Sequence, residues 1–75
     1  MEPLAENLTS CETQILQLHC DGFDCPRIAK IQETTTGTIE KHCENIRRKL
    51  DSKSMLRAVV IGLAYKLIVI RFVNE

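Results

Sequence analysis

The chain of 75 residues is long enough for one small domain and leaves no room for a second domain or a large active-site cleft. Its hydrophobic fraction of 44% argues against wholesale disorder, and its aromatic fraction of 4% disfavours a stacking platform for single-stranded nucleic acid. The formal net charge is zero, but residues 1–44 carry three basic and eight acidic side chains, whereas residues 45–75 carry seven basic and two acidic ones. A polyanionic partner is therefore expected to favour the second part of the chain.

The cellular setting follows from the first residues and from the apolar stretches. The start, MEPLAENLTS, is acidic and lacks an apolar run, so we expect no secretory signal and a reducing, cytoplasmic environment. The four cysteines are then expected to be free thiols. The apolar stretch 58–70 is too short to cross a bilayer and is interrupted by Lys66, so no membrane partner is expected.

Residues 1–7 are predicted to form a flexible arm, followed by a single domain over residues 8–75. Order is expected to begin at Leu8. Thr9 has the capping-box spacing to Glu12, in which the hydroxyl caps the helix and the carboxylate accepts from the Thr9 N–H. A first helix is therefore predicted from this box to about Cys20.

A short second helix follows after a turn. Gly22 suits the left-handed conformation that commonly follows a helix end. Pro26 is favoured in a first helical turn, so the second helix is predicted from Cys25 to about Gln32. The few residues before the next helix are typical of a helix-turn-helix arrangement.

The stretch 35–50 is predicted to form the longest helix, with two different faces. One face is an apolar stripe at helical period, made by Ile39, Cys43, Ile46 and Leu50. The other face is polar, made by Glu40, Lys41, Glu44, Arg47 and Arg48. The stripe is expected to pack on the domain, so the polar face is left for a partner.

A fourth helix is predicted over about 55–70, with Ser54 as its cap. It is apolar on more than one side, and a core of three other helices cannot cover every side of it. An exposed apolar patch of this kind usually marks an interface. The alternative is that the end of the chain folds back over its own core.

One set of residues follows a family pattern in register and without a gap: Leu8, Thr9, Glu12, Ile15, Leu16, Gly22, Ile28, Ala29, Thr38, Ile39, His42, Asn45, Ile46, Arg48, Lys49, Leu50, Ser54, Ala58 and Val59. With this spacing, the chain resembles the LuxR/GerE-type helix-turn-helix domain over roughly residues 8–67. Its length is similar to that of the stand-alone GerE.

The resemblance implies an all-α, four-helix domain whose second and third helices form the helix-turn-helix. It implies a cytoplasmic, bacterial transcription regulator, nucleoid-associated when bound, that reads a pseudo-palindromic duplex as a homodimer. The third helix would enter the major groove. The implied DNA-binding residues are Thr36, Thr38, Glu40, Lys41, Glu44, Arg47, Arg48 and Lys49. The fourth helix would dimerise, and the implied interface residues are Met55, Val59, Val60, Leu63 and Leu67.

The chain departs from the family pattern on the polar face of the third helix. Glu40 stands where the family commonly has lysine, and Glu44 stands where a basic residue is often found one turn later. Carboxylates there repel phosphates, although glutamate can accept a hydrogen bond from cytosine N4. A second hypothesis therefore stays open: an antagonist that does not bind DNA and pairs with a related regulator through its C-terminal helix.

The residue pattern favours structural roles over metal binding and catalysis. The candidate zinc ligands are His19, Cys20, Cys25, His42 and Cys43. Tetrahedral zinc needs four converging groups, but the cysteine spacing is looser than usual and Cys43 lies on the core stripe, so we expect no metal and no cofactor. His42 is expected to play a structural, hydrogen-bonding role. No nucleophile stands beside an evident base, so no enzyme activity is expected.

Overall fold

The computed structural model describes residues 8–71, which form four helices and no strand. The predicted all-α, four-helix architecture is therefore confirmed, while the predicted arm over residues 1–7 lies outside the described residues, as do residues 72–75. The helices are α1 (Ser10–Cys20), α2 (Cys25–Gln32), α3 (Thr36–Lys49) and α4 (Met55–Ala64).

Every helix begins at a residue whose side-chain oxygen accepts a hydrogen bond from a backbone N–H of the first turn. These N-cap residues are Thr9, Asp24, Thr35 and Ser54. The capping box predicted for α1 is complete, because the Thr9 N–H also donates to the Glu12 carboxylate at 3.0 Å. Caps of this kind satisfy orphan backbone groups and stabilise a helix by about 1 kcal/mol each.

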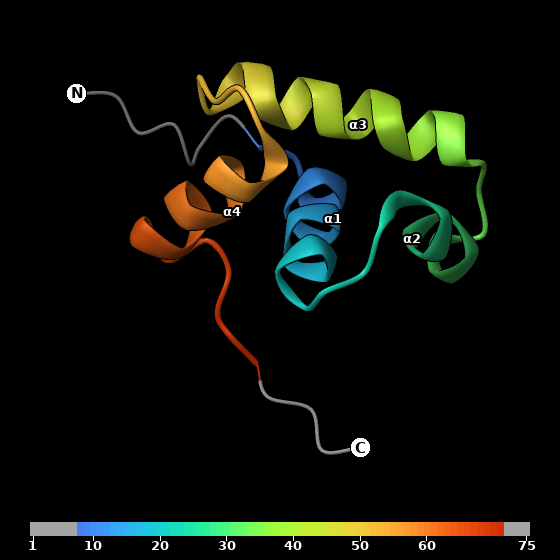
Figure 1. The fold of residues 1–75 in the computed structure, drawn as a ribbon, viewed down its shortest axis with the longest axis horizontal. Coiled ribbons are helices and arrows are strands. Elements are labelled where there is room, and N and C mark those ends of the chain that lie inside the picture. Colours follow the sequence, from blue (N-terminus) through green and yellow to red (C-terminus); the bar gives the residue numbers. More distant parts are fainter. Residues whose placement is uncertain (1–7, 72–75) are drawn as a thin grey trace.

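Helix α3 runs along one side of the domain, with α4, α1 and α2 arranged beneath it in the view of Figure 1. Both α1 and α3 contact all three other helices. The predicted apolar stripe of α3 is confirmed as part of the core, since each of its members is at most 1% exposed. The buried apolar core is completed by Ile15, Leu16, Ile28, Ala29, Ala58 and Ile68.

The turn between α2 and α3 is short and is held by hydrogen bonds to both helices. Glu33 ends α2 in the left-handed conformation, with a φ of 58°. The Thr34 N–H donates to the carbonyl of Ala29 at 2.9 Å, and Thr35 then caps α3. With Ile28, Ala29 and the α3 stripe buried together, this turn holds α2 and α3 as a packed helix-turn-helix pair.

The predicted fourth helix over about 55–70 is wrong at its end, because α4 stops at Ala64. Lys66 takes a φ of 63°, and the N–H of Leu67 donates to the carbonyl of Gly62 at 2.8 Å. The N–H of Lys66 donates to the carbonyl of Leu63 at 3.1 Å, which completes a Schellman-type helix end. Glycine is usual at the left-handed position after a helix end. Because Lys66 stands there, the sequence did not predict where α4 ends.

After this helix end, the chain folds back over α1. Ile68 is 3% exposed, and Gln17 exchanges two hydrogen bonds with the backbone of Val69, at 2.8 and 3.1 Å. Arg71 forms an ion pair with Asp21 beyond it. The alternative in which the end of the chain folds back over its own core therefore holds for Leu67 and Ile68, whereas Val69 and Ile70 stay exposed.

A partly buried ion pair joins the start of α1 to the end of α3 and predicts a pH dependence. Glu12 is 4% exposed and accepts from Lys49 Nζ at 2.8 Å. Burial by itself would raise the pKa of Glu12, but the hydrogen bonds from Lys49 and the Thr9 N–H outweigh burial and lower it. Because the folded pKa lies below the unfolded one, stability is present above the unfolded pKa and is lost as the pH falls through the folded one.

We therefore expect Glu12→Gln to cost about 1–2 kcal/mol of unfolding free energy near neutral pH, and progressively less as the pH falls below the pKa of the unfolded chain. Urea titrations of both proteins across this pH range measure the difference. Gln14→Glu, at an exposed site on α1, serves as the control. A cost of Glu12→Gln that does not change with pH would contradict the role assigned to the pair.

Candidate nucleic-acid interface

The face of α3 opposite the core stripe is open to solvent. Glu40, Lys41, Glu44 and Arg48 are exposed on it, and Arg47 is half-buried beside them. The i, i+4 spacing of Glu40 and Glu44 places them one turn apart on this face. The structure thus brings together most of the residues expected to contact DNA.

The hydroxyl groups at the start of α3 are partly used by the helix itself. Thr35 Oγ1 accepts from the Thr38 N–H at 3.2 Å and lies 2.9 Å from Thr38 Oγ1. Thr36 is the first residue of α3 and is half-buried. Thr38 remains exposed, so its hydroxyl still has capacity for a further hydrogen bond.

The basic residues at the end of α3 have different partners. Arg48 is exposed and donates from Nη2 to the Asn45 side-chain oxygen at 2.7 Å. Lys49, in contrast, is bonded to Glu12 across the domain, so its ammonium group is already engaged. Arg48 is therefore the better placed of the two for an external anion.

The two carboxylates of the exposed face are not neutralised by ion pairs inside the domain. Within residues 8–71, ion pairs join Lys49 to Glu12 and Arg71 to Asp21, and neither Glu40 nor Glu44 takes part. The face borders a shallow hollow of about 480 Å³, which is lined by Cys25, Gly37, Glu40, Lys41, Cys43, Glu44, Arg47 and Met55. Charged groups of both signs thus share this surface.

A comparison with known protein families shows to which family the chain belongs. The family described as "Bacterial regulatory proteins, luxR family" matches residues 6–64, which span all four helices. The chain belongs to the luxR family. The family resemblance of the sequence is confirmed, and membership of the luxR family indicates a DNA-binding transcription regulator. No curated protein matches this luxR-family chain significantly.

The residues predicted for a dimer interface differ in how far they are exposed on α4 and beyond it. Val60 is 56% exposed, but the other predicted interface residues pack partly against the core of their own domain: Met55, Val59, Leu63 and Leu67. Leu56, which is not among the predicted interface residues, is 77% exposed. Leu56 and Val60 are spaced i, i+4 in the sequence, which places their side chains on the same face of α4. Both side chains border a hollow of about 420 Å³ that Ser54, Arg57 and Ile61 also line.

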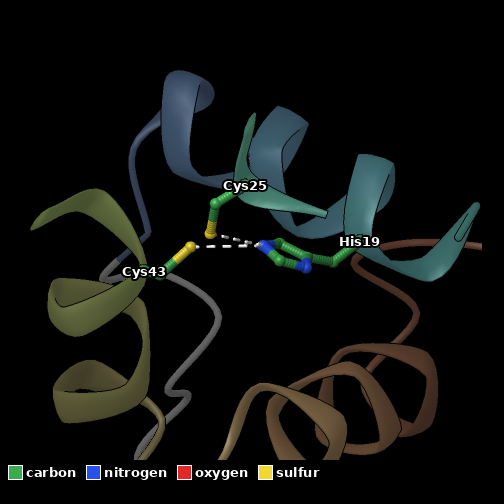
Figure 2. Close-up of side chains that lie close together, drawn as sticks. All are labelled: His19, Cys25 and Cys43. Carbon is green, nitrogen blue, oxygen red and sulfur yellow. Dashed lines mark hydrogen bonds between the residues drawn. The ribbon is translucent and has the colours of Figure 1, made fainter. Parts of the chain in front are cut away.

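Three of the five candidate zinc ligands lie together beside the exposed face of α3. Figure 2 shows the side chains of His19, Cys25 and Cys43 pointing toward one another from α1, α2 and α3. His19 Nε2 lies 3.2 Å from Cys43 Sγ and 4.0 Å from Cys25 Sγ, and all three ligand atoms lie within 4.8 Å of one another. Cys20 and His42 are not members of this cluster.

The protonation of the cluster follows from its burial. Burial lowers the pKa of His19, although the Asp24 carboxylate opposes this effect. Burial raises the pKa of the Cys43 thiol to about 12, and the neighbouring Cys25 adds to the rise. Near neutral pH the imidazole is therefore uncharged and the Cys43 thiol is protonated, so the 3.2 Å contact is a hydrogen bond between two neutral groups.

His42 differs from its expected hydrogen-bonding role. Its Nδ1 atom is buried and has no hydrogen-bond partner among residues 8–71. The ring lines a hollow of about 220 Å³ together with Cys11, Ile15, Gln32, Thr34, Thr38 and Ile39.

Among the described residues, no helix has both the length and the apolar character needed to cross a bilayer.

Proposed function

We propose that this luxR-family protein is a homodimeric, sequence-specific transcription regulator that reads duplex DNA with the exposed face of α3. The observation that carries the proposal is the solvent-facing polar side of α3, held by a buried stripe within a luxR-family helix-turn-helix. A helix fits the width of the major groove, so side chains on its outer face reach base edges. The proposed setting is the bacterial cytoplasm.

The side chains of α3 divide into two proposed roles. Glu40, Lys41 and Glu44 face base edges, where lysine suits guanine and a glutamate accepts from cytosine N4. Arg47 and Arg48, together with the hydroxyl groups of Thr36 and Thr38 at the other end of the helix, hold phosphates. Lys49 contributes indirectly, because its bond to Glu12 fixes the end of α3 on α1.

Arg48→Ala is expected to weaken duplex binding about tenfold, to a similar extent for all sequences, because it removes one phosphate contact. The slope of log K against log salt should become shallower by about one. Fluorescence anisotropy with a random and a selected duplex at several salt concentrations measures both quantities. Lys66→Gln removes the same charge from an exposed position beyond α4 and provides the control.

Two outcomes of that titration would contradict DNA binding. One is the failure of the unmodified protein to bind any duplex above background at low salt. The other is an equal loss in the Arg48 variant and in the Lys66 control, which would reduce the effect to net charge.

The proposed homodimer uses the outer surface of α4. Leu56→Glu combined with Val60→Glu is expected to convert the dimer to a monomer, because two carboxylates would be buried in an isologous contact. Sedimentation equilibrium measures the change, and binding to a palindromic duplex should fall in parallel. Ile31→Glu, at a residue of α2 that is 50% exposed, should leave the oligomeric state unchanged. A protein that is monomeric before any substitution would contradict this part of the proposal.

A second candidate function is favoured by Glu40 and Glu44. With both carboxylates unpaired inside the described domain, the face of α3 repels phosphates more than a basic recognition helix does. The protein would then act as an antagonist, pairing through α4 with a related regulator and blocking it. Pull-down of a larger regulator, lost on Val60→Glu, is the result expected for this function.

A further inference from the structure

The cluster of His19, Cys25 and Cys43 goes beyond what DNA reading requires. We propose that its imidazole nitrogen and its two sulfur atoms bind a thiophilic metal ion, with Zn²⁺ as the ion that suits them. The proposed site departs from the sequence-based expectation that the chain binds no metal. It does not rest on the proposed function.

The positions of the ligand atoms are close to those of a zinc site. Zinc–sulfur bonds of about 2.3 Å and zinc–nitrogen bonds of about 2.0–2.1 Å at tetrahedral angles place ligand atoms roughly 3.5–3.8 Å apart. His19 Nε2 is 3.2 Å from one sulfur and 4.0 Å from the other, and the three ligand atoms fit within 4.8 Å. The two nitrogen–sulfur distances thus lie on either side of the tetrahedral value, so the three side chains are already placed to surround one ion.

The three ligands are held by different, firmly packed parts of the domain. His19 lies in the last turn of α1, Cys25 is the first residue of α2, and Cys43 lies on the buried stripe of α3. The α1–α2 turn is bonded internally, with Gly22 N–H to the His19 carbonyl at 3.0 Å. The ligand set is thus preorganised by tertiary structure, and an ion bound there would link α1, α2 and α3.

The charge of the three ligands also matches that of the ion. Two thiolates and a neutral imidazole balance the charge of Zn²⁺, so the occupied site is formally uncharged. Binding releases the two thiol protons to solvent as the two zinc–sulfur bonds form, and no atom changes oxidation state. A neutral complex suits the buried position of Cys43, which is 1% exposed, far better than an isolated thiolate would.

The hollow beside α3 can supply the fourth ligand. Cys25 and Cys43 line this hollow together with Glu40 and Glu44, so water or a carboxylate oxygen can complete the tetrahedron. Lys41 and Arg47 line it as well, so its four charged side chains cancel and electrostatic attraction does not select the ion. Selection rests with the sulfur donors, which favour thiophilic ions over Mg²⁺ or Ca²⁺.

Titration of the reduced, metal-free, full chain with Co²⁺ tests the site directly. We expect one ion per chain, with thiolate-to-cobalt charge-transfer absorption and visible bands of tetrahedral intensity that Zn²⁺ then abolishes. Zn²⁺ should also raise the Tm by roughly 10–20 °C when free zinc is about a hundredfold above its Kd, because only the folded chain presents the three ligands together. Mg²⁺ should do neither.

Matched variants separate this site from adventitious binding by other thiols. Cys25→Ser and His19→Gln should each weaken Zn²⁺ binding at least about a hundredfold, while circular dichroism shows the helices intact. Cys11→Ser and Cys20→Ser remove thiols outside the cluster and should leave affinity, stoichiometry and cobalt spectrum unchanged.

Several results would overturn the proposal. One is the absence of one-to-one binding to the reduced chain, as expected if the contacts serve only as thiol–imidazole hydrogen bonds. Binding that survives both cluster variants, or that disappears in Cys11→Ser or Cys20→Ser, would also overturn it. None of these results bears on duplex binding by the metal-free chain, so the two proposals fail independently.

Discussion

Ile46→Ala is expected to lower the free energy of unfolding by about 2–5 kcal/mol. Ile46 is fully buried at the middle of the stripe by which α3 packs on the rest of the domain. The substitution leaves a cavity between elements that are already closely packed, so the lost contacts add to the lost hydrophobic transfer energy. Small domains have only about 5–15 kcal/mol in total, so this substitution should remove a large share of the stability.

Urea unfolding followed by circular dichroism measures this loss. Val60→Ala deletes methyl groups from an exposed position of α4 and should change the unfolding free energy by no more than about 0.5 kcal/mol. The control should be run at low protein concentration, where the proposed dimer does not contribute. A cost below about 1 kcal/mol for Ile46→Ala would be incompatible with the buried stripe.

Glu40→Lys combined with Glu44→Lys is expected to strengthen duplex binding at low salt by roughly a hundredfold to a thousandfold. Each substitution removes a charge that repels phosphate and adds one that can neutralise it. The slope of log K against log salt should steepen by about two. Both side chains are exposed, so the fold should not change.

Glu40→Gln combined with Glu44→Gln supplies the matched control for the charge reversal. The glutamine pair removes the repulsion without adding cations, so its affinity should lie between those of the unmodified protein and the lysine pair. Anisotropy titrations with random duplex compare the three proteins. Equal affinity for all three would show that this face of α3 does not approach DNA.

The same experiment separates the two proposed functions. If strong binding arises where the unmodified protein had none, the carboxylates block DNA and the antagonist is favoured. If the unmodified protein already binds and the substitutions change its preferred sequence, the carboxylates take part in base reading. Selection of duplexes from a random pool by each protein gives this second measurement.

Local sequence determined most of the helical architecture. Thr9 with Glu12 marked the start of α1, and Ser54 marked the start of α4, because caps act through hydrogen bonds within one turn. The stripe from Ile39 to Leu50 identified the buried side of α3 by its period, and so identified the exposed side too. These features depend on neighbours in the chain, which a sequence displays directly.

Tertiary structure alone decided where α4 ends and which thiols meet. Lys66 adopts a left-handed conformation that its side chain does not favour, and the contacts of Ile68 and Val69 with α1 stabilise the turn there. His19 and Cys43 are 24 positions apart and come within 3.2 Å only because α1 packs across α3. Spacing along the chain does not predict such contacts, since they depend on how whole helices pack.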